Sequence, residues 1–174
     1  IIHRDIKIEN IFLDAFNNYK LGDFGVSREG KGTATGTITG TADYMAPEIS
    51  KDHKYNSTVD IYALGIAMYQ LLNNRRNPFI DADNVPTSDD EANAQLKRLN
   101  GEVFPNPKFD SGELARIVKK ACAYDRHERY GTPQEMAEEL KKVLQTIDDE
   151  IVLEKREKFD FDGNTVHEKI DGGD

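Results

Sequence analysis

The sequence lacks the features that would tie it to a membrane, a disulfide framework or a nucleic acid. Of its 174 residues one is cysteine, Cys122, which excludes an internal disulfide and favours a reducing compartment. No apolar run approaches the roughly 18 residues that a transmembrane helix needs. The formal net charge is −9 and no basic stripe is present, so nucleic acid is not expected as a partner. We therefore expect a cytoplasmic protein with no membrane span in this chain.

The acidic residues are concentrated at one end of the chain. The segment from Asp148 to Asp174 holds ten acidic and four basic residues, which contributes −6 of the total of −9. Polar, charged segments of this kind bury too little apolar surface to fold alone. We expect a folded body over residues 1–147 and an acidic tail or linker over residues 148–174.

The beginning of the body has the pattern of short strands. Residues 11–13 and 19–21 are apolar or aromatic, and residues 14–18 between them have the composition of a hairpin turn. From residue 27 to residue 40 the sequence is rich in Thr, Ser and Gly, which predicts a long loop. Long loops in compact domains are usually functional or mobile.

The remainder of the body has helical patterns. Residues 57–73 are apolar nearly all round, which predicts a helix that protein covers on every side. Ser88 and Glu91 form a capping box that predicts a helix to about residue 99, and Ser111 is expected to cap the next one. Thr132 and Pro133 open a last helix, and Cys122 is expected in the core. The predicted fold class is mainly α, with a few short β-strands near the N-terminus.

Three short motifs occur in a fixed order near the start of the chain. His3-Arg4-Asp5 is followed by Asn10, then by Asp23-Phe24-Gly25 and by Ala46-Pro47-Glu48. Any one of these acidic or amide residues alone would be read as the cap of a turn. Together and in this order they resemble the C-terminal lobe of the eukaryotic-like serine/threonine protein kinases, over residues 1–147.

The resemblance implies a site for ATP and Mg²⁺, with Mn²⁺ able to replace Mg²⁺. Asp5 would accept the proton of a substrate hydroxyl, and Lys7 would place a positive charge on the γ-phosphate. Asn10 and Asp23 would hold the metal through hard oxygen ligands. Phe12 would lie under the adenine, although an ordinary core aromatic is the other reading.

Further roles follow from the same resemblance. Thr41 matches a threonine that bonds the catalytic Asp and Lys in serine/threonine kinases, which supports protein Ser and Thr hydroxyls as the acceptors. His3 and Phe24 would stack in an apolar column, and Gly25 would let the backbone flip.

The Thr-rich loop corresponds to the activation segment of the family. Four threonines in it are candidate phosphorylation sites: Thr33, Thr35, Thr37 and Thr39. Thr37 best matches the primary site of the family. A phosphate there needs cationic partners, and Arg4 and Arg28 match the positions of that pocket. The alternative is a flexible loop that is Thr-rich without regulation.

Several polar residues are expected to be structural. Glu48 and Arg129 match a buried ion pair that ties the activation segment to the helical base. Asp60 lies in an otherwise apolar helix, and the family's Asp at this place accepts backbone hydrogens from the catalytic loop. Tyr62 stands where many eukaryotic members carry Trp, which favours a bacterial type.

Half of a kinase active site has no counterpart in these residues. No Gly-x-Gly-x-x-Gly segment and no strand-borne Lys for the phosphates occur here. We therefore expect the chain to be part of a longer kinase, either cytoplasmic or the cytoplasmic part of a membrane-anchored one. The isolated chain is expected to be inactive without the N-terminal lobe and to associate with itself or another chain. The alternative is a pseudokinase or interaction module that keeps the scaffold; the presence of Asp5, Lys7, Asn10 and Asp23 favours the enzyme.

Overall fold

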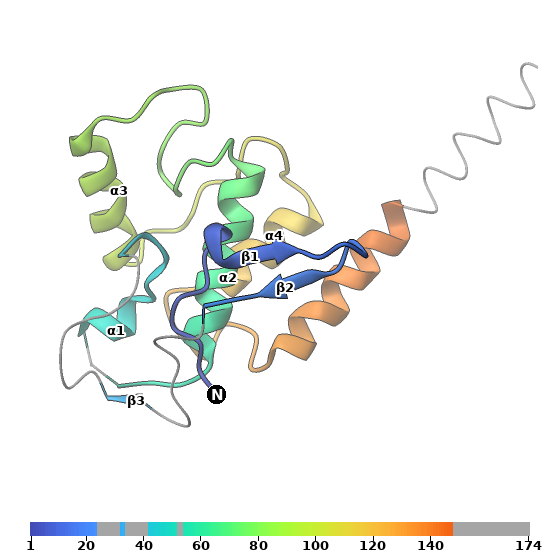
Figure 1. The fold of residues 1–174 in the computed structure, drawn as a ribbon. Helices are drawn as coiled ribbons and strands as arrows, with labels where there is room; N and C mark the ends of the chain where they lie inside the picture. The colour runs from blue at the N-terminus through green and yellow to red at the C-terminus, as the bar shows by residue number, and fades with distance from the viewer. Residues whose placement is uncertain (24–31, 34–41, 52–53, 148–174) are drawn as a thin grey trace, which may run out of the picture. The chain divides into compact units, whose positions relative to one another are not determined.

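The structure, a computed structural model, describes residues 1–23, 32–33, 42–51 and 54–147. The chain divides into two compact units, Ile1–Ala137 and Glu138–Asp174. The first unit is mostly helical and carries two pairs of short antiparallel strands (Figure 1). In the second unit, residues 138–147 are described and are helical. The predicted mainly helical fold is confirmed for the described residues, and the predicted tail over residues 148–174 lies outside them.

The core of the first unit surrounds helix α2, Thr58–Leu72, as its apolar sequence predicts. Helix α4, Glu113–Ala121, packs against α2 (Figure 1). The two helices approach closely at Gly65, where a Cβ atom would lie 2.6 Å from the Cys122 sulfur. Burial raises the pKa of the Cys122 thiol to about 12, so the thiol stays protonated. Cys122 is thus a small core residue, as predicted.

Two helix starts are capped by residues other than the predicted ones. Helix α3 spans Ser88–Leu99, but its capping box joins Thr87 to Asp90, not Ser88 to Glu91. The predicted box lies one residue too far along the chain, because Thr-x-x-Asp and Ser-x-x-Glu overlap in this segment. The N-cap residue of α4 is Gly112, not Ser111, and the Asp110 Oδ1 accepts from the Gly112 and Ala115 amides at 2.8 and 3.0 Å.

Two other helix starts follow the sequence more closely. Asn56 lies ahead of α2, and its Oδ1 accepts hydrogen bonds from the amide and hydroxyl of Thr58 at 3.0 and 2.6 Å. A further helix covers residues 133–147. Thr132 caps it, because its hydroxyl accepts from the Glu135 amide at 3.3 Å. Here the predicted N-cap is confirmed.

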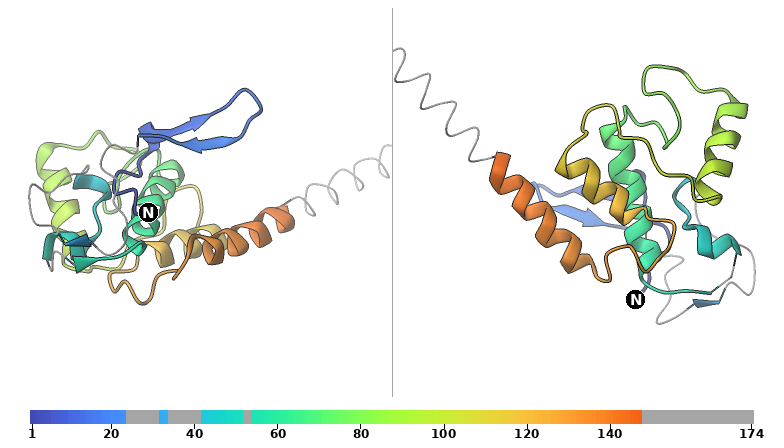
Figure 2. Two further views of the ribbon diagram at one scale, coloured as in Figure 1. Left: turned by 60° about the horizontal axis from the view of Figure 1, so that its bottom comes forward. Right: turned by 180° about the vertical axis from the view of Figure 1, so that it is seen from behind.

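The predicted hairpin is present at the expected positions. Strand β1, Ile11–Leu13, pairs antiparallel with β2, Tyr19–Leu21, and Ile11 lies opposite Leu21. Asp14 shapes the turn by accepting the Phe16 and Asn18 amides at 2.9 and 2.8 Å. The hairpin extends away from α2, and most of its side chains are exposed (Figure 2).

Short elements connect the hairpin to the helices. The 3₁₀ turns η1 and η2 span Ile8–Asn10 and Ala42–Tyr44, and helix α1 spans Pro47–Lys51. A second strand pair joins β3, Gly32–Thr33, to β4, Lys54–Tyr55, and was not predicted. Two-residue strands carry too little periodicity to be recognised in a sequence.

Among the described helices, none has the length and apolar character needed to cross a bilayer.

Candidate active site

The first loop of the chain is fixed by a carboxylate from α2. Asp60 Oδ2 accepts from the His3 amide at 2.7 Å, and Oδ1 accepts from the Arg4 amide at 2.9 Å. These are the contacts that the resemblance implies for Asp60. They explain how a carboxylate can lie in an apolar helix, because both of its oxygens have hydrogen-bond donors.

The backbone of this loop is strained at Arg4. Its φ angle is 68°, in the left-handed region that costs a non-glycine residue on the order of 1 kcal/mol or more. The turn directs two consecutive amides toward Asp60 and carries the chain on to Asp5. Strain of this kind persists where the surrounding contacts over-determine the conformation.

Asp5, Lys7 and Asn10 form a compact cluster. The Asn10 amide nitrogen donates to the Asp5 carbonyl oxygen at 2.8 Å and to Asp5 Oδ2 at 2.9 Å. Lys7 Nζ lies 3.0 Å from the same Oδ2, and the two side chains are 24% and 13% exposed. The 3₁₀ turn η1 brings Asn10 back over the loop, because the backbone amide of Asn10 donates to the Lys7 carbonyl at 3.0 Å. The structure thus brings these three predicted residues together.

His3 connects this loop to the second motif. The Asp5 amide donates to His3 Nδ1 at 3.4 Å, so Nε2 carries the proton that is shared with the Gly22 carbonyl at 3.0 Å. Gly22 also donates its amide to the Asn10 carbonyl at 2.9 Å. The residue that precedes Asp23 is therefore held by both His3 and Asn10.

Phe12 and Asp23 flank the same glycine. A Cβ atom on Gly22 would lie 2.7 Å from the Phe12 ring, so only glycine leaves room for this ring. Phe12 is still 56% exposed. Asp23 is exposed and has a φ angle of 59°, a conformation that Asp tolerates better than most residues. Within the described residues, no group of three or more His, Cys, Asp or Glu could hold a metal ion.

Glu48 and Arg129 form a buried, bidentate ion pair. Arg129 Nη1 donates to Glu48 Oε1 at 2.7 Å, and Nη2 donates to Oε2 at 2.9 Å. The guanidinium also donates to the carbonyls of Ala123, Thr58 and Tyr124. The ion pair that the resemblance implies is present, and it joins α1 to the segment that follows α4.

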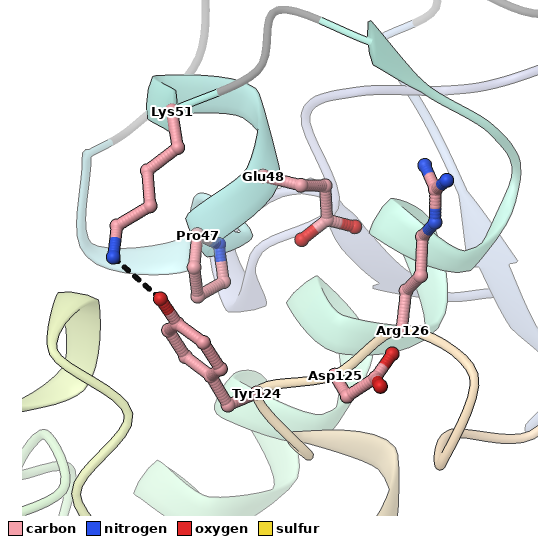
Figure 3. Close-up of a pocket in the computed structure, with 6 residues that line it drawn as sticks. All are labelled: Pro47, Glu48, Lys51, Tyr124, Asp125 and Arg126. Atoms are coloured by element: carbon pink, nitrogen blue, oxygen red, sulfur yellow. Dashed lines mark hydrogen bonds between the residues drawn. The ribbon is translucent and has the colours of Figure 1, made fainter.

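A pocket of about 310 Å³ lies beside this ion pair. It is lined by side chains from α1 and from the segment after α4: Pro47, Glu48, Lys51, Tyr124, Asp125 and Arg126 (Figure 3). Lys51 reaches across to the Tyr124 hydroxyl and joins the two walls. None of the Asp5 cluster lines the pocket, so it is separate from the candidate active site.

Several predicted residues lie outside the described part of the chain: Phe24, Gly25, Arg28, Thr35, Thr37, Thr39 and Thr41. Thr33 is described for its backbone alone, in β3. Arg4 is described, and its Nη1 donates to the Tyr55 hydroxyl at 3.2 Å.

Two residues that hold other parts of the chain in place, Tyr55 and Arg98, are not predicted by the sequence. Tyr55, which accepts from Arg4, gave no signal in the sequence. Arg98 is 5% exposed and donates to the carbonyls of Ala42 and Asp43. It lies four residues after the buried Ala94 on α3, but the sequence gives no signal of its burial, because a charged residue on a polar helix ordinarily faces water.

Comparison with known proteins gives a consistent result. The family profile described as "Protein kinase domain" matches residues 1–142. The chain is 49% identical to Serine/threonine-protein kinase ppk16 of Schizosaccharomyces pombe over 128 residues, which cover 71% of this chain and 18% of that protein. It is 38% identical to Protein kinase C epsilon type of Oryctolagus cuniculus over 133 residues, covering 75% of this chain and 17% of that protein.

A third relative matches further along the chain. Protein kinase C zeta type of Oryctolagus cuniculus is 34% identical over 163 residues, covering 90% of this chain and 27% of that protein. The chain thus spans less than a third of the length of these relatives. All three come from eukaryotes, and the bacterial type suggested by Tyr62 stays a prediction.

Proposed function

This chain belongs to the protein kinase family, and on this premise we propose that the protein containing it is a serine/threonine kinase, which transfers the γ-phosphoryl group of ATP to Ser or Thr hydroxyls of proteins. The observation that carries the proposal is the cluster of Asp5, Lys7 and Asn10. One carboxylate oxygen there is held by an amide at 2.9 Å and by an ammonium at 3.0 Å.

Asp5 is the proposed catalytic base. Its Oδ2 is fixed by Asn10 and Lys7, which leaves the carboxylate oriented to accept the proton of a substrate hydroxyl and to direct that oxygen toward phosphorus. Lys7 lies close enough to Asp5 to stabilise the charge that a phosphoryl group brings to the same place. Thr41 is proposed to bond both residues.

Asn10 and Asp23 are proposed to hold Mg²⁺, the ion that the family generally uses with ATP. Their oxygens suit this ion, because the Asn10 nitrogen is directed at Asp5 and its carbonyl oxygen can face a cation, while the Asp23 carboxylate is exposed. Two protein ligands leave the other positions to phosphate oxygens and water. When bound, the ion would neutralise charge on the phosphates. Phe12, with its ring half exposed, is proposed to contact the adenine.

We assign residues 1–147 to the C-terminal lobe of the kinase domain and residues 148–174 to an acidic tail or linker. The helical first unit and the family match over residues 1–142 support this assignment. These residues contain no Gly-x-Gly-x-x-Gly segment, and we propose that another part of the parent supplies the phosphate-binding loop. The isolated chain is therefore expected to lack turnover.

Regulation is proposed to act through the activation segment. Phosphate on Thr37, or on one of its neighbours Thr35, Thr39 and Thr33, would pair with Arg4 and Arg28. The Arg4 guanidinium is already oriented by the Tyr55 hydroxyl at 3.2 Å.

The exposed hairpin supports a proposal about partners. Phe12, Phe16 and Tyr19 are 56%, 85% and 78% exposed. Exposed aromatic side chains on one hairpin favour contact with another chain or segment. We propose that the isolated chain self-associates through them; light scattering that finds a monomer at high concentration would contradict this.

The activity is tested on the full-length parent with Mg·ATP and a protein substrate. Asp5→Asn and Asp23→Asn are expected to lower phosphate transfer by about 10²-fold or more. Asp89→Asn, on the exposed first turn of α3, is the matched control and should leave transfer unchanged. A parent that transfers no phosphate would instead indicate a pseudokinase or interaction module. Equal transfer in all three variants would exclude Asp5 and Asp23 from the catalytic site.

A further inference from the structure

Arg98 is a charged residue in a place that an apolar side chain would fill at lower cost. It is 5% exposed, and with Ala94 it forms the buried stripe of an otherwise polar helix α3. Taking a guanidinium out of water costs several kcal/mol unless its donors are satisfied. The contacts that Arg98 makes must therefore account for its presence.

The two hydrogen bonds that Arg98 donates to backbone carbonyls both go to one short segment. Arg98 Nη2 donates to the Ala42 carbonyl at 2.7 Å, and Nη1 donates to the Asp43 carbonyl. Two consecutive carbonyls of η2 are thus held by the two nitrogens of one planar group. A planar fork with fixed donors fixes the orientation of the backbone as well as its position.

The other end of η2 is held through a chain of side-chain amides. The Tyr44 hydroxyl donates to Gln70 Oε1 at 2.6 Å, and Gln70 Nε2 donates to Asn77 Oδ1 at 2.7 Å. Asn77 Nδ2 then donates to Glu91 Oε2 at 3.3 Å, on α3. Glu91 and Arg98 are seven residues apart, two helical turns, so α3 reaches η2 at both ends.

The turn η2 lies between Thr41 and Glu48 in the chain, so its contacts bear on both ends of this segment. It follows Thr41 directly and precedes Glu48, which Arg129 holds. Two buried arginines thus fix the segment from residue 42 to residue 48, one at each end. A shift of η2 would move the backbone that leads out of Thr41.

We propose that Arg98 is a positioning residue for the protein substrate: it holds the Ala42–Asp43 backbone where the acceptor peptide passes the catalytic cluster. This inference rests on the proposed kinase function. It predicts that Arg98 affects use of the protein substrate and leaves ATP binding unchanged, because Arg98 holds Ala42 and Asp43 while the proposed nucleotide contacts, Phe12, Asn10 and Asp23, lie in other segments of the chain.

The test uses the full-length parent with three substitutions. Arg98→Met removes the hydrogen-bond donors and keeps a long apolar side chain. Arg98→Lys keeps the positive charge and an ammonium that can donate to one of the two carbonyls. Arg116→Met removes an exposed arginine of α4 and is the control. Steady-state kinetics give kcat and KM for protein substrate and for ATP. Hydrogen exchange at the amides of residues 43–46 reports η2 without requiring activity.

Arg98→Met is expected to lower kcat/KM for the protein substrate about 10- to 100-fold with an unchanged KM for ATP. Its residues 43–46 should exchange faster while α4 does not, and Arg98→Lys should recover part of both effects. Wild-type kinetics and exchange in Arg98→Met would overturn the proposal, as would an equal loss for both substrates with faster exchange throughout. If Arg98→Met does not fold, the intermediate values expected of Arg98→Lys decide.

The two proposals fail in different ways. A wild-type parent that transfers no phosphate contradicts the kinase function, and positioning of a protein substrate falls with it. Even then, exchange at residues 43–46 in the Arg98 variants still decides whether Arg98 holds η2.

Discussion

The side chain of Asn10 makes two hydrogen bonds to Asp5: its Nδ2 donates to the Asp5 backbone carbonyl at 2.8 Å and to the carboxylate Oδ2 at 2.9 Å. One side chain thereby fixes both the backbone and the carboxylate of the proposed base. The same residue receives the Gly22 amide on its own carbonyl, at 2.9 Å, so it also orders the approach to Asp23.

Replacing Asn10 should therefore damage catalysis more than folding. Asn10→Ala frees the Asp5 carboxylate and removes a proposed metal ligand, and we expect phosphate transfer by the parent to fall by about 10²-fold or more. Asn93→Ala, exposed on α3, is the control and should retain full activity. Steady-state kinetics at saturating ATP measure the effect. Equal activity in the two variants would remove Asn10 from the site.

Loss of Glu48 should cost stability, because it leaves the Arg129 charge buried. The arginine side chain is 0% exposed, so Glu48→Ala is expected to lower the free energy of unfolding by about 3–5 kcal/mol. The comparison is Glu113→Ala, which breaks the exposed pair with Arg116 and should cost at most about 1 kcal/mol. Urea denaturation measures both values, and similar losses would contradict the structural role of the buried pair.

Gly65 should not tolerate even one added methyl group. Its Cβ would lie 2.6 Å from the Cys122 sulfur and 2.9 Å from the Ala121 Cβ, so α2 and α4 would have to separate. We expect Gly65→Ala to lower the free energy of unfolding by about 1–3 kcal/mol, despite the better helix propensity of Ala. At Gly112, the N-cap residue of α4, the nearest atom is 3.9 Å away, so Gly112→Ala meets no clash and should cost less than Gly65→Ala. A stabilised Gly65→Ala protein would show that the helices are less tightly packed.

The start of α3 should respond to acid. The Thr87 amide and hydroxyl donate to Asp90 and hold the pKa of its carboxyl below the ordinary value of 3.8. The ionised carboxylate therefore stabilises the folded state at pH values above 3.8, and this stabilisation is lost as the pH falls through the lowered folded-state pKa. NMR titration should find a midpoint below 3.8 that rises in Thr87→Ala. A midpoint that does not move would exclude the Thr87 hydroxyl as a cause, because Thr87→Ala keeps the amide that also donates to Asp90.

The sequence alone predicts those features of the fold that depend on residues close together in the chain. Asp14 fixes the turn of the hairpin through hydrogen bonds inside that turn, and the apolar surface of α2 requires burial on all sides. These features depend on neighbours in the chain, so the pattern alone predicted them. The three ordered motifs likewise identified Asp5, Asn10 and Asp23 as candidates.

The contacts of Arg98 and the choice of helix caps could not be predicted in this way. Arg98 contacts residues more than fifty positions away, and a charged residue on a polar helix ordinarily faces water. Ser88 and Thr87 are adjacent and chemically alike, and only the backbone at Thr87, with φ −83° and ψ 168°, decides which one caps α3. Tertiary structure determines both outcomes.

The most direct test of the central claim is the identity of the phosphorylated residue. The full-length parent is incubated with γ-labelled Mg·ATP and a protein substrate that offers Ser, Thr and Tyr, and the labelled amino acids are separated after hydrolysis. The account predicts phosphoserine or phosphothreonine, lost in Asp23→Asn. Phosphotyrosine alone, or label that persists in Asp23→Asn, would contradict it.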